Sequence, residues 1–167
     1  MSARRRVIVG HGPDGASRVV ADQVVPTVVL APSGGELTVL GGADELLGLP
    51  VAVAVDLPDT FIPPPGGWRA AILSFPPVGH PPPAEGTGTV LPDLAERMRA
   101  GGGRGMHDTP TVDVVHLLSG ELVMELDHGE NVRLAPGDTV VQNGTRHGWR
   151  NPGPVPATLL LLMVGAS

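Results

Sequence analysis

The sequence predicts an all-β fold, a sandwich or barrel of many short strands, with one short helix. Short apolar runs rich in valine recur along the chain, and frequent glycine and proline separate them, with 24 Gly and 19 Pro in 167 residues. A chain of this length fits one domain, and such a domain buries a sizeable core without disulfides or structural zinc. We therefore expect a single domain over residues 1–167.

The N-terminal part of the chain contains six short apolar segments that predict strands. They are residues 7–9, 17–20, 27–30, 37–40, 51–55 and 70–75. Turn-forming residues at 11–15 and 32–35 lie between these segments. We expect residues 1–75 to supply N-terminal strands that complete the barrel.

The middle of the chain predicts a connector followed by a helix. Residues 75–88 are rich in proline and glycine, so they cannot pair as a central strand. Residues 91–100 form the best helical window, because Pro92 suits a first turn and the glycines from Gly101 onward end a helix. We assign residues 76–104 to a Pro/Gly-rich connector and one short helix.

Beyond Gly105 the apolar segments follow one another at short intervals. The predicted strands are residues 111–118, 121–127, 131–134, 139–142 and 157–164. The first three have turn residues between them and predict a β-meander, in which consecutive strands pair. We assign residues 105–164 to the core of the domain.

The composition excludes several kinds of chemistry. Cysteine is absent, so the chain has no disulfide framework, no thiol nucleophile and no thiolate-bound zinc or iron–sulfur cluster. All 11 basic residues are arginines and tyrosine is absent, which excludes a lysine Schiff base and a phenolic acid catalyst. Histidine, carboxylate, serine and threonine side chains remain available for catalysis.

The charge and hydropathy patterns limit the partners of this chain. A formal charge of −6 argues against a phosphate-binding surface, so we expect no nucleic acid. The longest apolar run, residues 158–164, is far too short for a membrane-spanning helix, and no signal-like stretch follows the first residues. We expect a cytoplasmic protein that binds a small-molecule substrate.

Residues 105–120 and 137–151 form two motifs rich in histidine and glycine. The positions that matter are His107, Gly120, Gly137, Gly144, His147 and Asn151. Together they resemble the two motifs of the cupin superfamily, in particular small single-domain bacterial cupins. The resemblance implies a cupin-type antiparallel β-barrel, or jelly roll, with a metal pocket in the second half of the chain.

Three positions depart from the pattern of that family. Thr109 stands where the family has a second histidine, and Asp113 stands where it has a glutamate. Gln142 replaces a proline, with one residue fewer between it and Gly137. A three-histidine site is thereby reduced to two histidines and one carboxylate.

Residue spacing bears on whether the remaining ligands can meet. His107, Thr109 and Asp113 share one parity and therefore one side of an extended segment. Six residues of straight strand span roughly 20 Å, too far for two ligands of one ion. Pro110 supplies the break that lets the chain turn and bring Asp113 back beside His107. His147 arrives from the second motif.

The resemblance makes His107, Asp113 and His147 the ligands of one divalent metal ion. Two imidazoles and one carboxylate with open positions suit iron, zinc, nickel or manganese. The remaining pocket positions are assigned to Thr109, Val115, Met124, Gln142 and Trp149.

Each ligand has a plainer interpretation that stays open. For His107 it is a hydrogen-bonded histidine at a strand end, for Asp113 a residue at a strand entry, and for His147 a satisfied core imidazole. Asn151 is expected to fix the turn after its strand.

The functional hypothesis is a metal-dependent enzyme that acts on a small oxygenated metabolite. The metal would act as a Lewis acid in a lyase, cyclase or isomerase reaction, with His107 and His147 as the proton-transfer residues. An Fe(II)-dependent oxygenase and a non-catalytic module that binds a small ligand are the alternatives. We also expect a homodimer, because such barrels associate through exposed strands, and the N-terminal half is long enough to supply an exchanged strand.

Overall fold

The computed structural model describes residues 4–46, 48–49, 60–102 and 105–167. These residues form many strands and one α-helix, so the predicted all-β class is confirmed. The elements are β1 (Arg4–His11), β2 (Ser17–Val25), β3 (Val28–Val29), β4 (Glu36–Ala43), β5 (Trp68–Phe75), α1 (Pro92–Ala100), β6 (Thr111–Ser119), β7 (Leu122–Glu125), η1 (Asp127–Gly129), β8 (Asn131–Leu134), β9 (Thr139–Asn143), β10 (Gly148–Arg150) and β11 (Ala157–Gly165).

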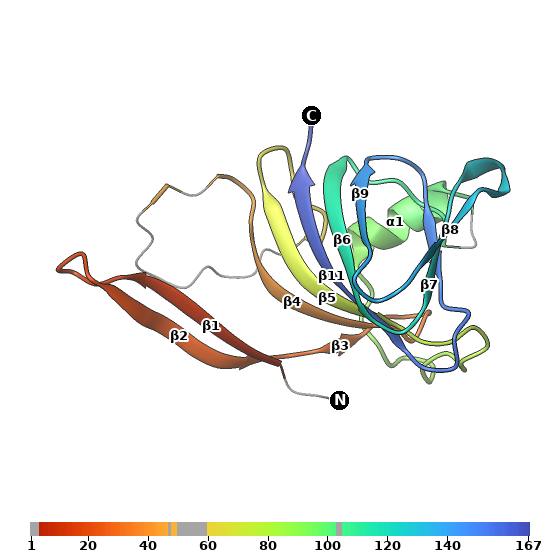
Figure 1. Cartoon of the computed structure of the whole chain (residues 1–167), viewed down its shortest axis with the longest axis horizontal. Coiled ribbons are helices and arrows are strands. Elements are labelled where there is room, and N and C mark those ends of the chain that lie inside the picture. The colour runs from red at the N-terminus through yellow and green to blue at the C-terminus, as the bar shows by residue number, and fades with distance from the viewer. Residues whose placement is uncertain (1–3, 47, 50–59, 103–104) are drawn as a thin grey trace.

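Two antiparallel sheets build the barrel. The larger has the strand order β3-β4-β5-β11-β6-β9, and the smaller has the order β10-β7-β8. The larger sheet curves, with the smaller sheet beside it and α1 next to the barrel (Figure 1). Within the larger sheet, β11 and β6 pair over almost their whole length.

The core lies on the inner faces of these strands because burial alternates along them. In β6 the buried positions include Asp113, Val115 and Leu117, and in β11 they include Leu159 and Met163. Such a period of two is expected when one face of a strand packs inward and the other points out. The site described below is built on these inner faces.

Helix α1 begins at the predicted position and is fixed at its start. Pro92 takes the first helical position, where its missing N–H costs nothing. The Asp93 carboxylate accepts a hydrogen bond of 2.7 Å from the backbone N–H of Ile62, which ties the helix to the segment before β5. Helix α1 is nine residues long, and no helix in the part of the chain that the structure describes has the length and apolar character of a membrane span.

The β-meander predicted for residues 111–134 is wrong in its first strand pairing, that of β6 with β7. Strand β6 pairs with β11 and β9, whereas β7 pairs with β8 and β10 in the other sheet. The turn at Gly120, with a φ of 81°, therefore carries the chain from one sheet to the other. The short strand β10 was not predicted, and the strand predicted at residues 51–55 lies outside the described residues.

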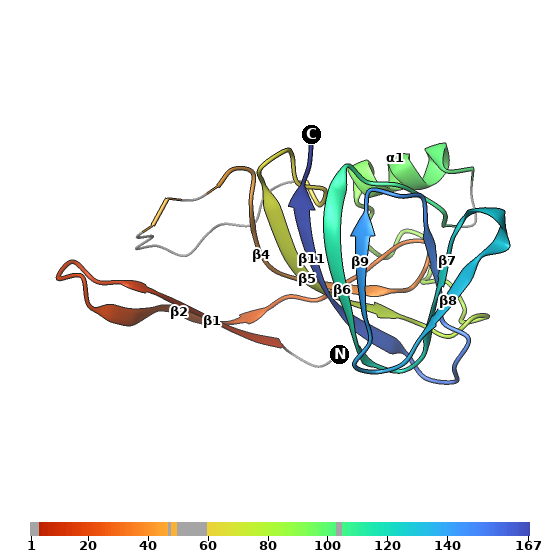
Figure 2. The same ribbon diagram turned by 45° about the horizontal axis from the view of Figure 1, so that its top comes forward.

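Strands β1 and β2 form a separate two-stranded hairpin, called the arm here and comprising residues 4–25. The arm extends away from the barrel beyond β4 (Figure 2). It is anchored at its base, where Val25 is buried and the Arg6 guanidinium donates a hydrogen bond to the carbonyl oxygen of Leu40. The rest of the arm makes its backbone pairs within itself.

Candidate functional site

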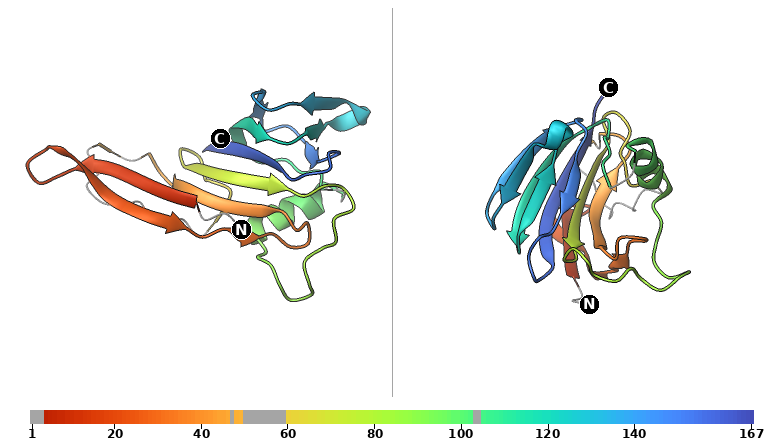
Figure 3. Two further views of the ribbon diagram at one scale, coloured as in Figure 1. Left: turned by 60° about the horizontal axis from the view of Figure 1, so that its bottom comes forward. Right: turned by 90° about the vertical axis from the view of Figure 1, so that its right-hand side faces the viewer.

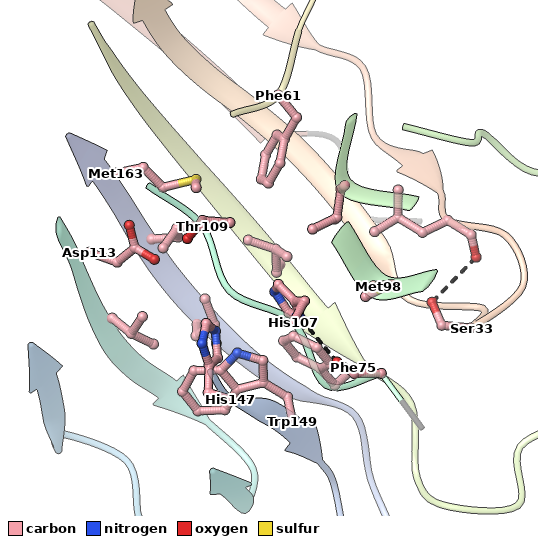
Figure 4. Close-up of a pocket in the computed structure, with 17 residues that line it drawn as sticks. Ser33, Phe61, Phe75, Met98, His107, Thr109, Asp113, His147, Trp149 and Met163 are labelled. Atoms are coloured by element: carbon pink, nitrogen blue, oxygen red, sulfur yellow. Dashed lines mark hydrogen bonds between the residues drawn. The ribbon is translucent and has the colours of Figure 1, made fainter. Parts of the chain in front are cut away.

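A cavity of about 190 Å³ lies inside the barrel. Its walls are mostly apolar side chains from β5, β6, β11 and α1, and it is lined by Leu30, Ser33, Phe61, Leu73, Phe75, Leu94, Met98, Gly105, His107, Thr109, Asp113, Val115, His147, Trp149, Leu159, Leu161 and Met163. His107, His147 and Trp149 lie at one end, and Asp113, Thr109 and Met163 lie at the other (Figure 4).

The two histidines are brought together by the backbone. His107 and His147 form an isolated antiparallel bridge, in which the N–H of each donates to the carbonyl oxygen of the other at 2.8 Å. Their ring centroids are 4.6 Å apart, and both residues are buried. The pairing therefore joins the first motif to the second at the cavity wall.

Each imidazole is oriented by a carbonyl oxygen two residues before it in the chain. His107 Nδ1 lies 2.9 Å from the carbonyl oxygen of Gly105, and His147 Nδ1 lies 2.9 Å from that of Thr145. Because a carbonyl oxygen only accepts, Nδ1 of neutral His107 carries the proton and Nε2 keeps its lone pair. Histidines that bind metals are commonly held in this way.

Gln142 does not line the cavity but lies behind His147. Its Nε2 atom is 2.6 Å from His147 Nδ1 and also donates to the carbonyl oxygen of Thr145. His147 Nδ1 therefore has two neighbours, and its tautomer depends on which of them it contacts. The glutamine side chain positions the imidazole from outside the cavity.

Asp113 is only 4% exposed and projects from β6 into the same cavity. Its Oδ1 atom is buried and has no hydrogen-bond partner among the residues that the structure describes. Burial is the main cause that raises the pKa of this carboxyl group, opposed by the Thr111 hydroxyl and by His107. An oxygen atom of this kind is available to a ligand in the cavity.

Burial also changes the ionisation of the two histidines. The pKa of His107 and the pKa of His147 are both lowered, because desolvation disfavours the charged imidazolium form. Backbone carbonyl oxygens partly oppose this effect at each ring. The cavity therefore holds both histidines in the neutral form that can bind a metal ion or accept a proton.

The predicted metal ligands are only partly grouped. Among the described residues, no set of three histidine, aspartate or glutamate side chains is arranged to hold one metal ion. His107 and His147 are adjacent, while Asp113 shares the cavity without joining them in such a set. The donor types nevertheless fit a divalent ion, since two neutral imidazoles and one unpartnered carboxylate oxygen face the same space. The triad stays a prediction.

The other pocket residues predicted from the sequence are divided between the cavity and its surroundings. Thr109, Val115 and Trp149 line the cavity, and the indole of Trp149 packs edge-on against His147 with ring centroids 5.7 Å apart. Met124 is buried on β7 as the strand partner of Trp149, but it does not line the cavity.

Several lining residues were not predicted. Leu159, Leu161 and Met163 come from alternate positions of β11, and Leu94 and Met98 come from α1. Residues 157–164 were predicted as a strand, but both faces of this strand are apolar, so the sequence did not show which face points inward.

Comparison with known protein families finds a match for the second half of the chain. Residues 95–164 match the family model described as Cupin domain. The matched region contains both histidines, Asp113 and the strands β6 to β11 up to Val164. This region of the chain is therefore a cupin domain, as the two motifs indicated.

Individual relatives are similar over shorter segments. One is the Phomopsin biosynthesis cluster protein C' of Diaporthe leptostromiformis, 46% identical over 54 residues, which cover 32% of this chain and 29% of that protein. Another is the Oryzines biosynthesis cluster protein J of Aspergillus oryzae, 48% identical over 46 residues, which cover 28% and 26%. The matched segment thus spans less than a third of the length of these curated relatives.

Solved structures with a similar fold include the cupin domain of an XRE family transcriptional regulator from Enterobacter cloacae. It has a TM-score of 0.39 and 17% sequence identity, and the match covers 60% of this chain and 83% of that one.

Proposed function

We propose that this protein is a metal-dependent cupin enzyme that acts on a small, mostly apolar oxygenated molecule. The observation that carries the proposal is the cavity itself, in which two neutral histidines and a buried carboxyl group are the ionisable side chains of a mostly apolar wall. The names of the curated relatives refer to biosynthesis clusters, which fits a role in making or modifying a small molecule.

The dimensions of the cavity support a small substrate. A cavity of about 150 Å³ accommodates benzene, so about 190 Å³ suits a molecule slightly larger than a single ring. None of the described residues that line it is an arginine, so a charged group of the substrate would have to be paired by the metal ion and not by a side-chain cation. We infer a substrate whose oxygen atoms contact the ion and whose hydrocarbon frame contacts the apolar wall.

The chain's own residues would orient this molecule. His107 and His147 would hold the divalent ion through Nε2, since Nδ1 of each contacts a backbone carbonyl oxygen. The bound ion would supply Lewis-acid polarisation of a substrate oxygen. Asp113 Oδ1 would accept a hydrogen bond from a substrate hydroxyl, or complete the ligand set. The leucine and methionine side chains would exclude water around the reacting group.

The second candidate is a metal-free cupin that only binds such a ligand. It is favoured by one observation, namely that no three-residue metal set is assembled among the described residues. In this case His107 and His147 would serve as hydrogen-bond partners for the ligand oxygen.

Metal content distinguishes the two candidates. The full chain, purified without a polyhistidine tag and loaded in turn with Fe(II), Zn(II), Ni(II) and Mn(II), should retain about one equivalent of one ion per chain by elemental analysis. His107→Ala and His147→Ala should each reduce retention at least about tenfold, because each removes one of the few ligands.

His116→Ala is the matched control, because His116 lies on the same strand as Asp113 but on its outward face, where its Nδ1 contacts the Thr139 hydroxyl. This variant should retain the ion in full. Protein that holds no ion under any loading condition would exclude the metal-dependent enzyme and leave the ligand-binding module. Stoichiometric iron would favour the oxygenase, and zinc or nickel a lyase or cyclase.

A further inference from the structure

The ionisable side chains of the cavity are divided between its two ends. His107 and His147 lie together at one end, with ring centroids 4.6 Å apart, whereas Asp113 lies at the other end beside Thr109 and Met163 (Figure 4). Among the described residues, no three histidine, aspartate or glutamate side chains are arranged around a common metal position. We call these two places the imidazole end and the carboxyl end of the cavity.

Two side chains flank Asp113 across the strands, and neither donates a hydrogen bond to its Oδ1 atom. Strand β6 lies between β9 and β11 in the larger sheet, so Asp113 has Gln142 on one side and Met163 on the other (Figure 3). Methionine has no donor. The Gln142 Nε2 atom contacts the carbonyl oxygen of Thr145 and the Nδ1 atom of His147. A donor for Asp113 must therefore come from elsewhere.

The threonine hydroxyls at the carboxyl end also leave this oxygen unpaired. Thr109 Oγ1 lies 2.7 Å from Thr111 Oγ1, so these two hydroxyls bond to each other. Asp113 Oδ1 has no hydrogen-bond partner in the described part of the chain, although the side chain is only 4% exposed. A buried acceptor without a donor is rare and costs stability, and a donor supplied by a ligand removes that cost.

The cavity is the place where such a donor can lie. Asp113 lines it together with apolar side chains of the same sheet, such as Val115 of β6 and Leu161 of β11. None of the described lining residues is an arginine, and the chain contains no lysine, so the lining offers the carboxyl group no side-chain cation. Gln142 Oε1 is also buried without a described partner, but Gln142 does not line the cavity. Asp113 therefore offers a ligand the unpaired acceptor of this end.

We propose that Asp113 recognises the substrate instead of holding the metal ion. It accepts a hydrogen bond from an O–H or N–H group that the substrate carries at the end remote from its ion-bound oxygen. The substrate class is thereby narrowed to small molecules with two polar ends, an oxygen for the imidazole end and a hydrogen-bond donor for the carboxyl end, joined by a hydrocarbon frame. This inference rests on the proposed function for the imidazole end, but the contact at Asp113 is testable without a metal ion.

Three ligands of matched shape test the contact. Benzyl alcohol, benzylamine and ethylbenzene share a ring and a methylene group, and they differ only in the terminal hydroxyl, amine or methyl group. They suit a cavity of about 190 Å³, because about 150 Å³ accommodates benzene. Isothermal titration calorimetry on the full chain, with a chelator present, gives their dissociation constants independently of any ion.

Asp113→Leu should weaken the binding of the alcohol or of the amine at least about tenfold, because it removes the acceptor. Ethylbenzene should bind this variant at least as tightly as the wild type, since it gains an apolar neighbour. Asp113→Asn separates the two donors, because it keeps an acceptor oxygen without the charge. A hydroxyl should still bind this variant as it binds the wild type, whereas an ammonium group should lose affinity.

Asp108→Asn is the matched control for these variants. The Asp108 side chain is 53% exposed, lies 3.9 Å from Arg97 and does not line the cavity. This variant removes a nearby negative charge without changing the carboxyl end, so the affinities of all three ligands should stay as in the wild type. Circular dichroism checks that every variant is folded.

Metal retention tests whether Asp113 is a ligand of the ion. Loaded with the same four ions, Asp113→Leu should retain the ion to within about twofold of the wild type, whereas loss of a ligand reduces retention about tenfold. A tenfold loss would overturn the proposal. So would alcohol and amine affinities that Asp113→Leu leaves unchanged, or a failure of both to bind the wild type. A wild type that holds no ion contradicts the metal-dependent enzyme alone, because the calorimetry still decides whether Asp113 recognises a donor.

Discussion

At the scale of single residues, the cavity is defined by three ionisable groups that burial drives toward their neutral forms. His107, His147 and Asp113 share one apolar space, and the pKa of each moves in the direction that removes its charge. Backbone carbonyl oxygens contact both histidines, whereas one oxygen of the Asp113 carboxyl group has no partner in the described part of the chain. The three residues therefore differ in what they contribute to stability.

Asp113→Asn should change the pH dependence of stability. Because the folded pKa of Asp113 is raised above 3.8, the folded state binds more protons, and the wild type loses stability as pH rises through that pKa. The asparagine variant lacks this loss, so its free energy of unfolding relative to wild type should increase by about 1–2 kcal/mol between pH 4 and pH 8. Urea unfolding with a chelator present measures the difference, and a difference constant with pH would contradict the expectation.

The histidines should have the opposite effect. Their folded pKa lies below the unfolded value of 6.5, so the unfolded state binds more protons and stability is lost as pH falls below about 6.5. Each histidine contributes up to about 1.4 kcal/mol per pH unit in that range. His147→Gln should reduce the slope of unfolding free energy against pH relative to the wild type. An equal slope in the two proteins would argue against a buried, neutral His147.

At the scale of elements, Asn151 closes the loop between β10 and β11. Its Nδ2 donates to the carbonyl oxygens of Phe75 and Val155 at 2.8 Å, and its Oδ1 accepts from the N–H of Gly153. The side chain is buried, so it ties this loop to the end of β5. The expectation that Asn151 fixes the turn after its strand is confirmed.

Asn151→Ala should destabilise the protein by about 2–3 kcal/mol, because it removes three hydrogen bonds from a buried position. Asn131→Ala is the matched control, since Asn131 also donates to a backbone carbonyl oxygen, that of Gly129, but at an exposed position. The control should change stability by less than about 0.5 kcal/mol. Chemical denaturation compares the two, and similar losses would show that burial of Asn151 is unimportant.

Local patterns predicted where elements begin and end but not which of them pair. Turn residues such as Gly120 and Gly137 bounded the strands, and Pro92 marked the start of α1. The partners of β6 are β9 and β11, well beyond the adjacent β7, and a pattern of alternating residues carries no information about a distant partner. This is why the meander was wrong.

The sequence likewise predicted only part of the candidate site. The motif spacing identified His107 and His147, and the bridge between them brings them together as expected of two motifs that share one pocket. Met124 was assigned to the cavity, but it pairs with Trp149 without lining the cavity itself. Met124 is buried all the same, so burial does not identify the residues that line the cavity. The contributions of α1, such as Met98, depend on how the helix packs, which its sequence alone does not determine.

At the scale of the whole molecule, the chain consists of a barrel with a cavity and an arm that leaves it. The N-terminal strands do more than complete the barrel, because β1 and β2 form their own sheet. Strands β3, β4 and β5 of residues 1–75 belong to the larger sheet, whereas β1 and β2 of the arm do not.

The two faces of strand β6 belong to different surfaces of the molecule. Asp113 and Val115 line the cavity, while Val112 and Val114, each one residue away, lie on the exposed outer face of the larger sheet. A ligand that displaces β6 from inside the cavity would therefore also move the valines of that outer face.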